Sequence, residues 1–256
     1  MPPAAAPTSV PETDHDLAVM TWEDAGDALL GADAVVVPTG STEQHSVHLP
    51  LSTDALRADH LSAALVEAAP DHGLDLLRAP TLPYGDSEHH MTFPGTVTLS
   101  QDAYRDALID IGASLAEHGA ERVLFLNCHG GNREALSLAT DRLNRDHDVG
   151  AHFVHWTDFG RDELEERFGD GWGHAGDHET SFVELVREDL VRSDRKEPQE
   201  ADGTPETRSW TYVSDVTELG GLGDPTNSDP EFMAEVVEHT TDRILAALAE
   251  DVENGW

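Results

Sequence analysis

The chain has 256 residues and a formal net charge of −36, from 15 Lys and Arg against 51 Asp and Glu. So few cations cannot form the basic surface that nucleic-acid backbones require; the single cysteine, Cys128, excludes a disulfide framework; and no apolar run approaches the roughly 18 residues of a membrane-spanning helix. The first 19 residues contain Pro, Thr, Glu and Asp where a secretory signal has a basic start and an apolar run. We therefore expect a cytoplasmic protein without nucleic-acid or membrane partners. Its dispersed acids favour the solvated surface of a salt-adapted protein over an acidic tail that binds a basic partner.

The N-terminal half is expected to contain a loose segment and then alternating strands and helices. Residues 1–16 are rich in Pro, Ala, Thr and acids and predict a flexible segment, whereas residues 17–256 fit a single domain by length. Apolar periodicity then predicts, in chain order, a strand over 32–37, a helix from Asp54 to near Pro70, a strand over 74–78, and a helix through Tyr104 and Leu115 that Gly119 ends.

The C-terminal half continues this alternation. Its pattern predicts a strand over 123–126, a helix through 136–143, a strand over 151–156, a helix that Asp177 caps, an irregular stretch over 194–228, and a last helix that Asp229 and Pro230 begin. The alternation predicts an α/β fold: a single layered domain whose mostly parallel central sheet is flanked by helices. Ligands of such sheets bind beyond the carboxyl ends of the strands, which is where the polar motifs of this chain occur.

The first polar motif follows the strand at 32–37 and reads Gly-Ser-Thr-Glu-Gln-His from residue 40. Glu43 and His45 are two residues apart, so they point the same way in an extended stretch, and Asp54 follows at a loop-to-helix junction. Carboxylate and imidazole together suit Zn, Mn or Fe. These residues alone leave a metal site and an ordinary polar loop equally open.

The second motif ends the strand at 123–126 and contains Cys128, His129, Gly130 and Gly131. Two glycines let the backbone turn sharply or approach a ligand closely. Cys128 is a candidate nucleophile, although a lone cysteine at a strand end is more often packed.

The third motif, residues 174–181, begins a helix and supplies His174 and Glu179. One of these two side chains would bind a metal ion while the other handles protons. Helix capping and complementation of the helix dipole explain the carboxylates of this motif equally simply.

Taken together, the motifs resemble those of the creatininase (creatinine amidohydrolase) family. Five blocks occur in family order across roughly residues 20–250: 40–54, 84–90 with 93–96, 127–132, 174–181 and 220–226. The resemblance implies an amidohydrolase with a single α/β domain that assembles as a homohexamer. It also implies two divalent metal ions per subunit, with Zn as the first choice and Mn or Fe as alternatives.

The resemblance implies a ligand set as well. Glu43, Asp54 and His129 would hold one metal ion. His45 and Asp54 would hold the second, so that Asp54 bridges the two. A bound metal ion lowers the pKa of its water toward about 7 and polarises a carbonyl oxygen, which suits hydrolysis of an amide.

One position departs from creatininase proper, in which a glutamate follows the loop histidine by two residues. That position is Gly131 here. Relatives with the His-Gly-Gly-Asn loop draw the acid from the later motif, so Glu179 is predicted to be a metal ligand and, with His174, a catalytic residue. His174 matches the proton-transfer histidine of the family.

The substrate stays open among several hypotheses. The first is a small amide, cyclic ones such as creatinine included, and the second is a formylamino-pyrimidine ribosyl phosphate of riboflavin or deazaflavin synthesis. Members of the family also include peptidases that trim a modified precursor peptide. Arg57 and Arg133 are candidate phosphate ligands, although surface ion pairs explain them equally well. Hypotheses of other classes are a non-catalytic metal-binding paralogue and a hydrolase that uses Cys128 as its nucleophile.

Candidate substrate-binding residues complete the prediction, namely His90, Gly130, Gly131, Trp156 and Trp172. The two tryptophans would stack on a flat substrate, although core packing explains them as well.

Overall fold

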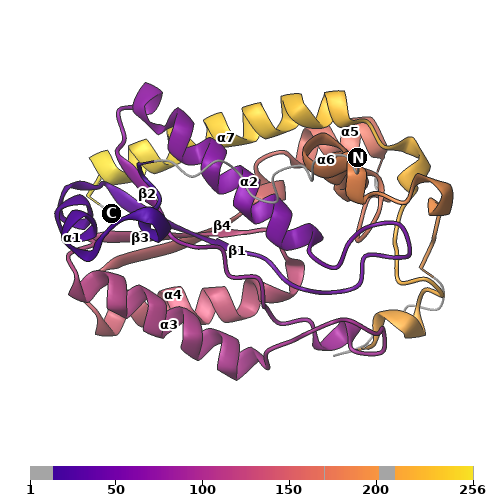
Figure 1. Cartoon of the computed structure of the whole chain (residues 1–256), viewed down its shortest axis with the longest axis horizontal. Helices are drawn as coiled ribbons and strands as arrows, with labels where there is room; N and C mark the ends of the chain where they lie inside the picture. Colours follow the sequence, from indigo (N-terminus) through magenta and orange to yellow (C-terminus); the bar gives the residue numbers. More distant parts are fainter. Residues whose placement is uncertain (1–13, 170, 202–210, 256) are drawn as a thin grey trace, which may run out of the picture.

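The computed structural model describes residues 14–169, 171–201 and 211–255 (Figure 1). Residues 1–13 of the predicted flexible segment lie outside this described part, and within it Asp16 is buried and forms an ion pair with Arg78. Across the described residues, no helix combines the length and the apolar character needed to span a bilayer.

A parallel sheet forms the centre of the described fold, with four strands in the order β2-β1-β3-β4. The strands are β1 (Ala34–Thr39), β2 (Leu76–Arg78), β3 (Arg122–Asn127) and β4 (Gly150–His155). In β1, Val35 is aligned with Leu77 of β2 on one side and with Val123 of β3 on the other. Every residue of β1 is buried, as expected for a parallel strand that is covered on both faces.

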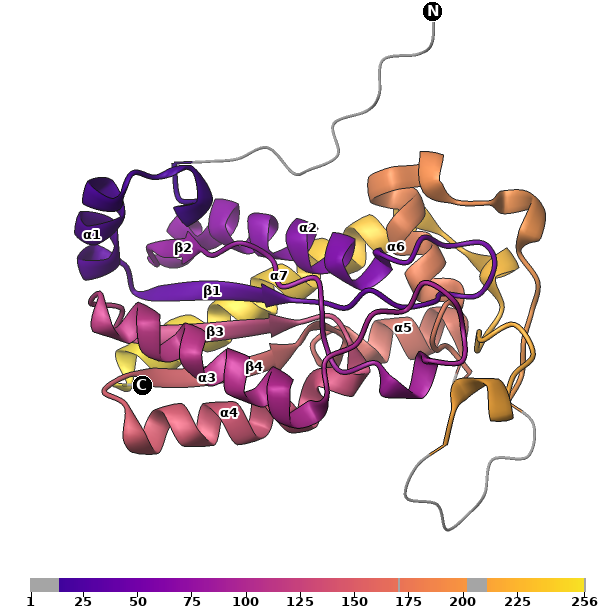
Figure 2. The same ribbon diagram turned by 60° about the horizontal axis from the view of Figure 1, so that its bottom comes forward.

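Helices cover both faces of this sheet, as Figures 1 and 2 show. One face carries α2 (Thr53–Ala68), α6 (Asp177–Arg187) and α7 (Pro230–Glu253), with α5 (Arg161–Phe168) packed against α6. The other face carries α3 (Gln101–Glu117) and α4 (Arg133–Asp146), and α1 (Trp22–Gly31) adds Leu29 to the core on this face. The α/β fold predicted from the sequence is confirmed.

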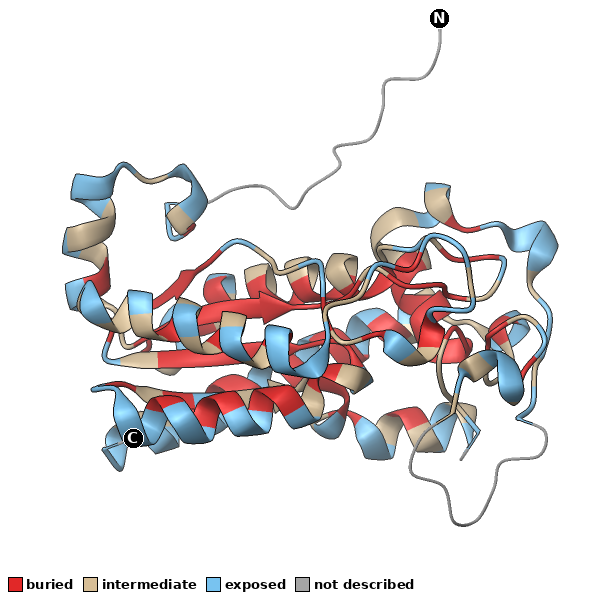
Figure 3. Cartoon of the chain, turned by 90° about the horizontal axis from the view of Figure 1, so that it is seen from below, coloured by how far each residue is buried: buried red, intermediate tan, exposed pale blue. Residues whose placement is uncertain are grey.

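The side chains of the strands alternate between two cores. Val36 and Leu124 point to the face of α2 and α7, whereas Val35 and Val123 point to the face of α3 and α4. Figure 3 shows the result, with buried strands between helices whose outward sides are exposed. Because successive side chains of a strand point to opposite faces, each strand contributes apolar residues to both cores.

Two helices, α1 and α5, were not expected from the sequence. Each buries a single residue, Leu29 in α1 and Leu164 in α5. One buried position gives too narrow an apolar stripe for a helical period to be recognised.

The helix starts predicted at Asp229 and Asp177 agree with the structure, except that the second is shifted by one residue. Asp229 caps α7 by accepting the Phe232 N–H at 3.0 Å, and Pro230 is the first helical residue. The cap of α6 is Gly176, so Asp177 is its first helical residue instead. Of the irregular stretch predicted over 194–228, residues 202–210 lie outside the described part, and the remainder contains short 3-10 turns and an isolated β-bridge between Gln199 and Gly223.

The order of the strands places a crevice between β1 and β3. From β1 the chain proceeds to β2 on one side, and it later returns to form β3 on the other side. Ligands of α/β sheets bind at such a switch point, beyond the carboxyl ends of the two strands. Gly40 shapes this place, because a Cβ there would lie 2.6 Å from the Ala55 backbone nitrogen. Glycine therefore lets the end of β1 lie directly against the start of α2.

Candidate metal centre

Four chain segments meet at this crevice and bring the five predicted metal ligands together. Glu43 and His45 lie in the loop after β1, and His129 lies in the loop after β3. Asp54 and Glu179 lie in the first turns of α2 and α6, where the helix dipole favours a carboxylate. All five side chains are buried.

Glu43, Asp54 and His129 form a group that we call the first triad. The His129 Nδ1 atom lies 3.3 Å from Glu43 Oε1 and 3.2 Å from Asp54 Oδ2. One ligand atom from each residue lies within 4.8 Å of the others. Burial alone would raise the pKa of Glu43, but His129 outweighs it and the pKa lies below the usual value. Glu43 is therefore an ionised, buried carboxylate that needs a cation or a proton beside it.

The ring of His129 is oriented by a backbone carbonyl. Its Nε2–H donates to the Asp86 oxygen at 2.8 Å, which leaves Nδ1 facing the carboxylates. Such a bond to the remote ring nitrogen commonly fixes a metal-binding histidine. A Cβ at Gly131 would collide with that Asp86 oxygen and lie 2.5 Å from His129 Nε2. The loop therefore has no room here for the glutamate of creatininase proper.

His45, Asp54 and Glu179 form the second triad. The His45 Nε2 atom lies 3.3 Å from Asp54 Oδ1 and 3.4 Å from Glu179 Oε2. Its Nδ1–H donates to the Glu43 carbonyl oxygen at 3.2 Å, so Nε2 is the free ligand atom. Burial would lower the pKa of His45, but the carboxylates of Asp54 and Glu179 outweigh it and raise the pKa to about 9. The carboxylates of the second triad therefore favour a positive charge at His45.

Asp54 belongs to both triads through different oxygens. Its Oδ2 faces His129 of the first triad, and its Oδ1 faces His45 of the second. Asp54 Oδ2 and His45 Nε2 are buried and, among the described residues, have no hydrogen-bond partner. Unsatisfied buried polar atoms are costly. Two such atoms amid imidazole nitrogens and carboxylate oxygens fit a group of residues that could hold a metal ion.

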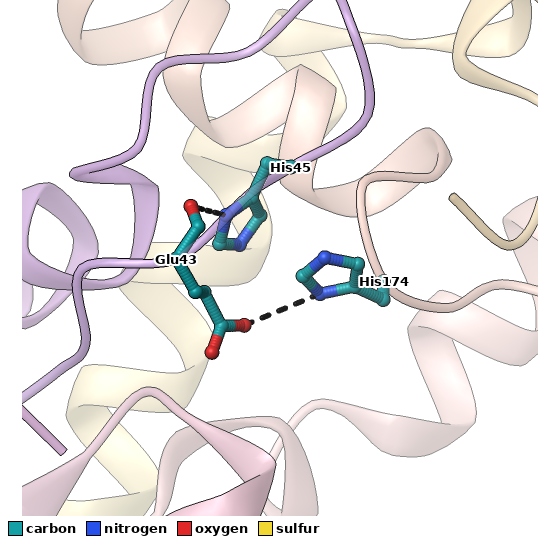
Figure 4. A group of neighbouring side chains, drawn as sticks. All are labelled: Glu43, His45 and His174. Carbon is teal, nitrogen blue, oxygen red and sulfur yellow. Dashed lines mark hydrogen bonds and ion pairs between the residues drawn. The ribbon is translucent and has the colours of Figure 1, made fainter. Parts of the chain in front are cut away.

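His174 faces the two triads from the loop before α6. Figure 4 shows its Nδ1 directed at Glu43, with 3.5 Å between Nδ1 and Oε1. Its Nε2–H donates to the Gln44 carbonyl oxygen at 2.7 Å, so only Nδ1 is available to the site. Burial lowers the pKa of His174, which makes it a neutral base at pH 7. It also forms a ligand group with Glu43 and His45, so the geometry alone permits a ligand or a proton carrier.

Several contacts that support the ligands were not predicted from the sequence. The Ser87 hydroxyl donates to Glu43 Oε2 at 2.5 Å. The Gln44 amide donates to His90 Nδ1 at 2.8 Å, so that His90 Nε2 faces Glu43 Oε1 at 3.4 Å. The block at 84–90 was noted for its resemblance and for His90 as a candidate substrate-binding residue, but no residue pattern pointed to these individual contacts.

The carboxylate of Glu179 is held from two sides. Its Oε2 accepts the Ala175 N–H at 2.6 Å, and Ala175 has the left-handed backbone φ of 52°. That conformation is uncommon for a residue with a side chain and often occurs at functional sites. Its Oε1 lies 2.7 Å from Nη2 of Arg57.

Arg57 is buried against the ligands and is not a surface residue. Its Nη2 contacts Asp54 Oδ1 and donates to the Cys128 carbonyl oxygen at 2.7 Å. The surface ion pair considered from the sequence is therefore wrong for Arg57. It holds for Arg133, which pairs with Asp158 at 2.8 Å in a partly exposed position.

A pocket of about 310 Å³ opens beside the triads. Among the predicted substrate-binding residues, His90, Gly130, Gly131 and Trp172 line it. Trp156 does not line it, because its side chain is fully buried in the core with its ring 5.5 Å from that of Phe182. Trp156 is thus not placed to stack on a substrate.

Three further histidines line the pocket and were assigned no role from the sequence: His89, His155 and His178. Burial lowers their pKa values to about 4, 3 and 3 respectively. These rings are therefore neutral hydrogen-bonding groups at pH 7. His155 ends β4 at the carboxyl edge of the sheet, and this position is the signal that could have revealed it.

The Cys128 thiol does not have the character of a nucleophile. The side chain is buried, and burial raises the pKa of the thiol. Because the thiolate is the reactive form, the structure speaks against the hypothesis of a cysteine hydrolase.

Comparison with known proteins identifies the group to which these residues belong. The family model described as creatininase, creatinine amidohydrolase, matches residues 18–248. The chain belongs to the creatininase family. As a creatininase-family protein it is a hydrolase, since the members and homologues that match it act on amide or peptide-type bonds.

Relatives within the creatininase family differ in their substrates. The mycofactocin precursor peptide peptidase of Mycolicibacterium smegmatis is 37% identical over 221 residues, which cover 82% of this chain and 83% of that protein. The creatinine amidohydrolase of Pseudomonas putida is 28% identical over 69% of this chain and 73% of that protein. A solved structure described as creatininase with Mn has a TM-score of 0.81 at 24% identity, covering 93% of this chain and 99% of that one. That likeness supports the fold.

Proposed function

We propose that the protein is a metal-dependent hydrolase that cleaves an amide bond of a short peptide. The observation that carries this proposal is the pair of triads joined by the two oxygens of Asp54, whose Oδ2 lacks a hydrogen-bond partner among the described residues. We expect two divalent ions per subunit, one in each triad. Imidazole nitrogen and carboxylate oxygen suit Zn first and Mn or Fe second.

When bound, the ions would supply water of lowered pKa and a Lewis acid for the carbonyl oxygen of the substrate. The chain's own residues supply the remaining chemistry. His174 accepts and returns a proton at Nδ1, because its Nε2–H is committed to the Gln44 carbonyl oxygen. Glu43 and Asp54 balance the cationic charge, and Ser87 keeps the Glu43 carboxylate in place.

A peptide is favoured over creatinine by the relatives. The peptidase of Mycolicibacterium smegmatis matches this chain at 37% identity, against 28% for the creatinine amidohydrolase. The position of Gly131 agrees with this choice, since the loop excludes the glutamate that marks creatininase proper. Neutral imidazoles along the pocket suit the uncharged amide groups of a peptide.

The phosphate-bearing formamide substrate is less well supported. Among the described residues that line the pocket, Arg57 is the only Arg or Lys. Its Nη2 is already engaged by Asp54, Glu179 and the Cys128 carbonyl oxygen. A phosphate entering this pocket would therefore lack the free cation that such an anion requires. A small cyclic amide such as creatinine remains the second candidate, supported by the 28% identical relative.

A substrate screen tests the proposal. The chelator-stripped full chain is assayed in molar KCl with Zn or Mn added separately, against a mycofactocin precursor peptide, creatinine and formylated pyrimidines. We expect metal-dependent release of a peptide fragment and little turnover of the other compounds. Turnover of creatinine alone would favour the second candidate, and bound metal without any turnover would favour the non-catalytic paralogue. Light scattering of the same sample tests the predicted homohexamer.

A further inference from the structure

The amide side chain of Gln44 links three segments of the chain beside the two triads. Gln44 lies in the loop after β1 and is 4% exposed. Its Oε1 atom accepts the Ser46 N–H at 2.8 Å. Its Nε2 atom donates to the Gly220 carbonyl oxygen at 3.0 Å and to His90 Nδ1 at 2.8 Å. Both N–H groups of the amide are therefore engaged by acceptors outside the loop of Gln44.

Two backbone groups fix which way this amide points. A backbone N–H can only donate a hydrogen bond and a backbone carbonyl can only accept one. The Ser46 N–H therefore requires the oxygen of the amide, and the Gly220 carbonyl requires its nitrogen. Ser46 has a left-handed backbone φ of 54°, which is uncommon for a residue with a side chain, and a Cβ at Gly220 would lie 2.3 Å from Gln44 Oε1. The backbone on both sides is thus shaped around the Gln44 side chain.

The orientation of the amide determines where His90 carries its proton. Because Gln44 donates to His90 Nδ1, that nitrogen must hold a lone pair. A neutral imidazole has a proton on one nitrogen only, so the proton of His90 is on Nε2. This Nε2 atom lies 3.4 Å from Glu43 Oε1. His90 therefore presents an N–H to the carboxylate of the first triad.

The backbone of Gln44 sets the opposite arrangement in His174. The Gln44 carbonyl oxygen accepts the His174 Nε2–H at 2.7 Å, so the lone pair of this ring is on Nδ1. The Nδ1 atom lies 3.5 Å from the same Glu43 Oε1 that His90 faces (Figure 4). The centroids of the two histidine rings are 4.4 Å apart. One residue thus places a nitrogen that donates and a nitrogen that accepts side by side at one carboxylate oxygen.

We infer that Gln44 is a positioning residue that holds His90 and His174 in complementary tautomers, with His90 a donor at Nε2 and His174 an acceptor at Nδ1. The value of this arrangement for hydrolysis rests on the proposed function. His174 can then take up a proton at Nδ1, while the His90 N–H stabilises the charge of the Glu43 carboxylate beside it. In the other tautomer, His90 would turn a second lone pair toward Glu43 and repel it.

Nitrogen NMR of the metal-free full chain tests this inference without relying on activity. The protein is labelled with ¹⁵N-histidine, and solid-state spectra at pH 7 in molar KCl distinguish protonated from unprotonated ring nitrogens. The spectra of His90→Asn and His174→Asn assign the two rings. Two variants then change the amide: Gln44→Met removes it and keeps a long side chain, and Gln44→Glu keeps its shape but replaces the donating nitrogen by an oxygen that accepts.

Gln199→Met is the matched control, because Gln199 holds the same late loop without a histidine. Its amide nitrogen donates to Ser46 Oγ at 2.9 Å, and its oxygen accepts the N–H groups of Leu219 and Gly221, each at 3.2 Å. A purely structural role in securing this loop would therefore be disturbed in Gln199→Met as well as in the Gln44 variants.

We expect both rings of the natural protein to carry a proton on Nε2 and a lone pair on Nδ1. Gln44→Met should give His90 a mixture of tautomers, and Gln44→Glu should place a proton on His90 Nδ1. His174 should stay unchanged in both variants, because the backbone carbonyl of residue 44 is retained, and Gln199→Met should change neither ring. A proton on His90 Nδ1 in the natural protein, or an unchanged His90 in the Gln44 variants, would overturn the inference.

Kinetics of the metal-loaded protein link the tautomers to hydrolysis. With the precursor peptide as substrate, Gln44→Met should lower kcat about 10–100-fold with KM within about threefold, and Gln199→Met should keep kcat within about threefold. An altered His90 tautomer with an undiminished kcat would contradict the positioning role. If Gln44→Met does not fold, the natural protein and Gln44→Glu decide the question. Absence of any metal-dependent turnover in a natural protein that has the expected tautomers would instead refute the proposed function.

Discussion

The two faces of the sheet are built in the same way and put to different uses. On one face, α2 and α6 bury polar and charged side chains, among them Asp54, Arg57 and Glu179. On the other face, α3 and α4 bury mainly apolar residues such as Leu108 and Leu143, and the hydroxyl of Thr140 bonds within its own helix. The difference teaches that the helices of one face contribute buried candidate ligands as well as apolar packing, whereas the helices of the other face contribute mainly apolar packing.

The largest effect is expected from removal of Asp54, the residue that both triads share. It lies on α2, on the face that we call the chemical face. Asp54→Ala takes one oxygen from each triad, so both metal ions and hydrolysis should be lost, by at least about a thousandfold in kcat/KM. Elemental analysis and the peptidase assay measure the two losses. Glu117→Ala, which removes an exposed carboxylate from α3, is the control and should change neither. An unchanged metal content in Asp54→Ala would contradict the bridging role.

On the face of α3 and α4, which we call the structural face, a core substitution should lower stability and leave metal content unchanged. Leu143 is fully buried on α4, so Leu143→Ala should lower the free energy of unfolding by about 2–5 kcal/mol while metal content stays the same. Leu138→Ala on the same helix removes a half-exposed side chain and should cost less than about 0.5 kcal/mol. Denaturant unfolding in molar KCl measures both. Loss of metal from folded Leu143→Ala would break the division between the faces.

A smaller effect is expected where the loop after β3 supports the first triad. Gly131→Ala forces a Cβ against the Asp86 oxygen that orients His129, so metal affinity of the first triad should fall about 10–100-fold. Gly130→Ala is the matched control, since a Cβ there has nothing within 4 Å. Equal affinities in the two variants would show that the carbonyl contact does not orient the ligand.

The smallest effect is expected at the surface of the structural face. Arg133→Ala on α4 breaks the pair with Asp158 and should cost about 0.2–1 kcal/mol at low salt, and less in molar KCl. Burial would raise the pKa of Asp158, but Arg133 outweighs it and lowers the pKa. The contribution of the pair is therefore present above the unfolded-state pKa of about 4 and is lost as the pH falls through the lowered value. A variant whose stability deficit persists unchanged at pH 2 would contradict this origin.

The strands and the candidate ligands could both be predicted from the sequence, because both are marked by residue type and spacing. The buried run at Val35 and the Glu43–His45 pair carry their own signals. The helices α1 and α5 were not predicted because each buries only one residue, and a helical period can be recognised only from several buried positions.

Contacts across the fold were beyond sequence reasoning. Whether Arg57 lies at the surface or between Asp54 and Glu179 depends on how α2 and α6 pack. The burial of Trp156, which follows β4 directly, likewise depends on Phe182 of α6. Such placements arise from three-dimensional packing and leave no local pattern.

The spread of the ligands along the chain has a consequence for how the enzyme matures. The two triads, which include Glu43, His129 and Glu179, come together only once β1, β3 and α6 are assembled. An unfolded chain would thus have low affinity for a metal ion. The ion would bind late in folding and would stabilise a fold that is nearly complete. If activity depends on metal as proposed, cells short of metal would accumulate a folded but inactive protein that becomes active on metal binding without new synthesis.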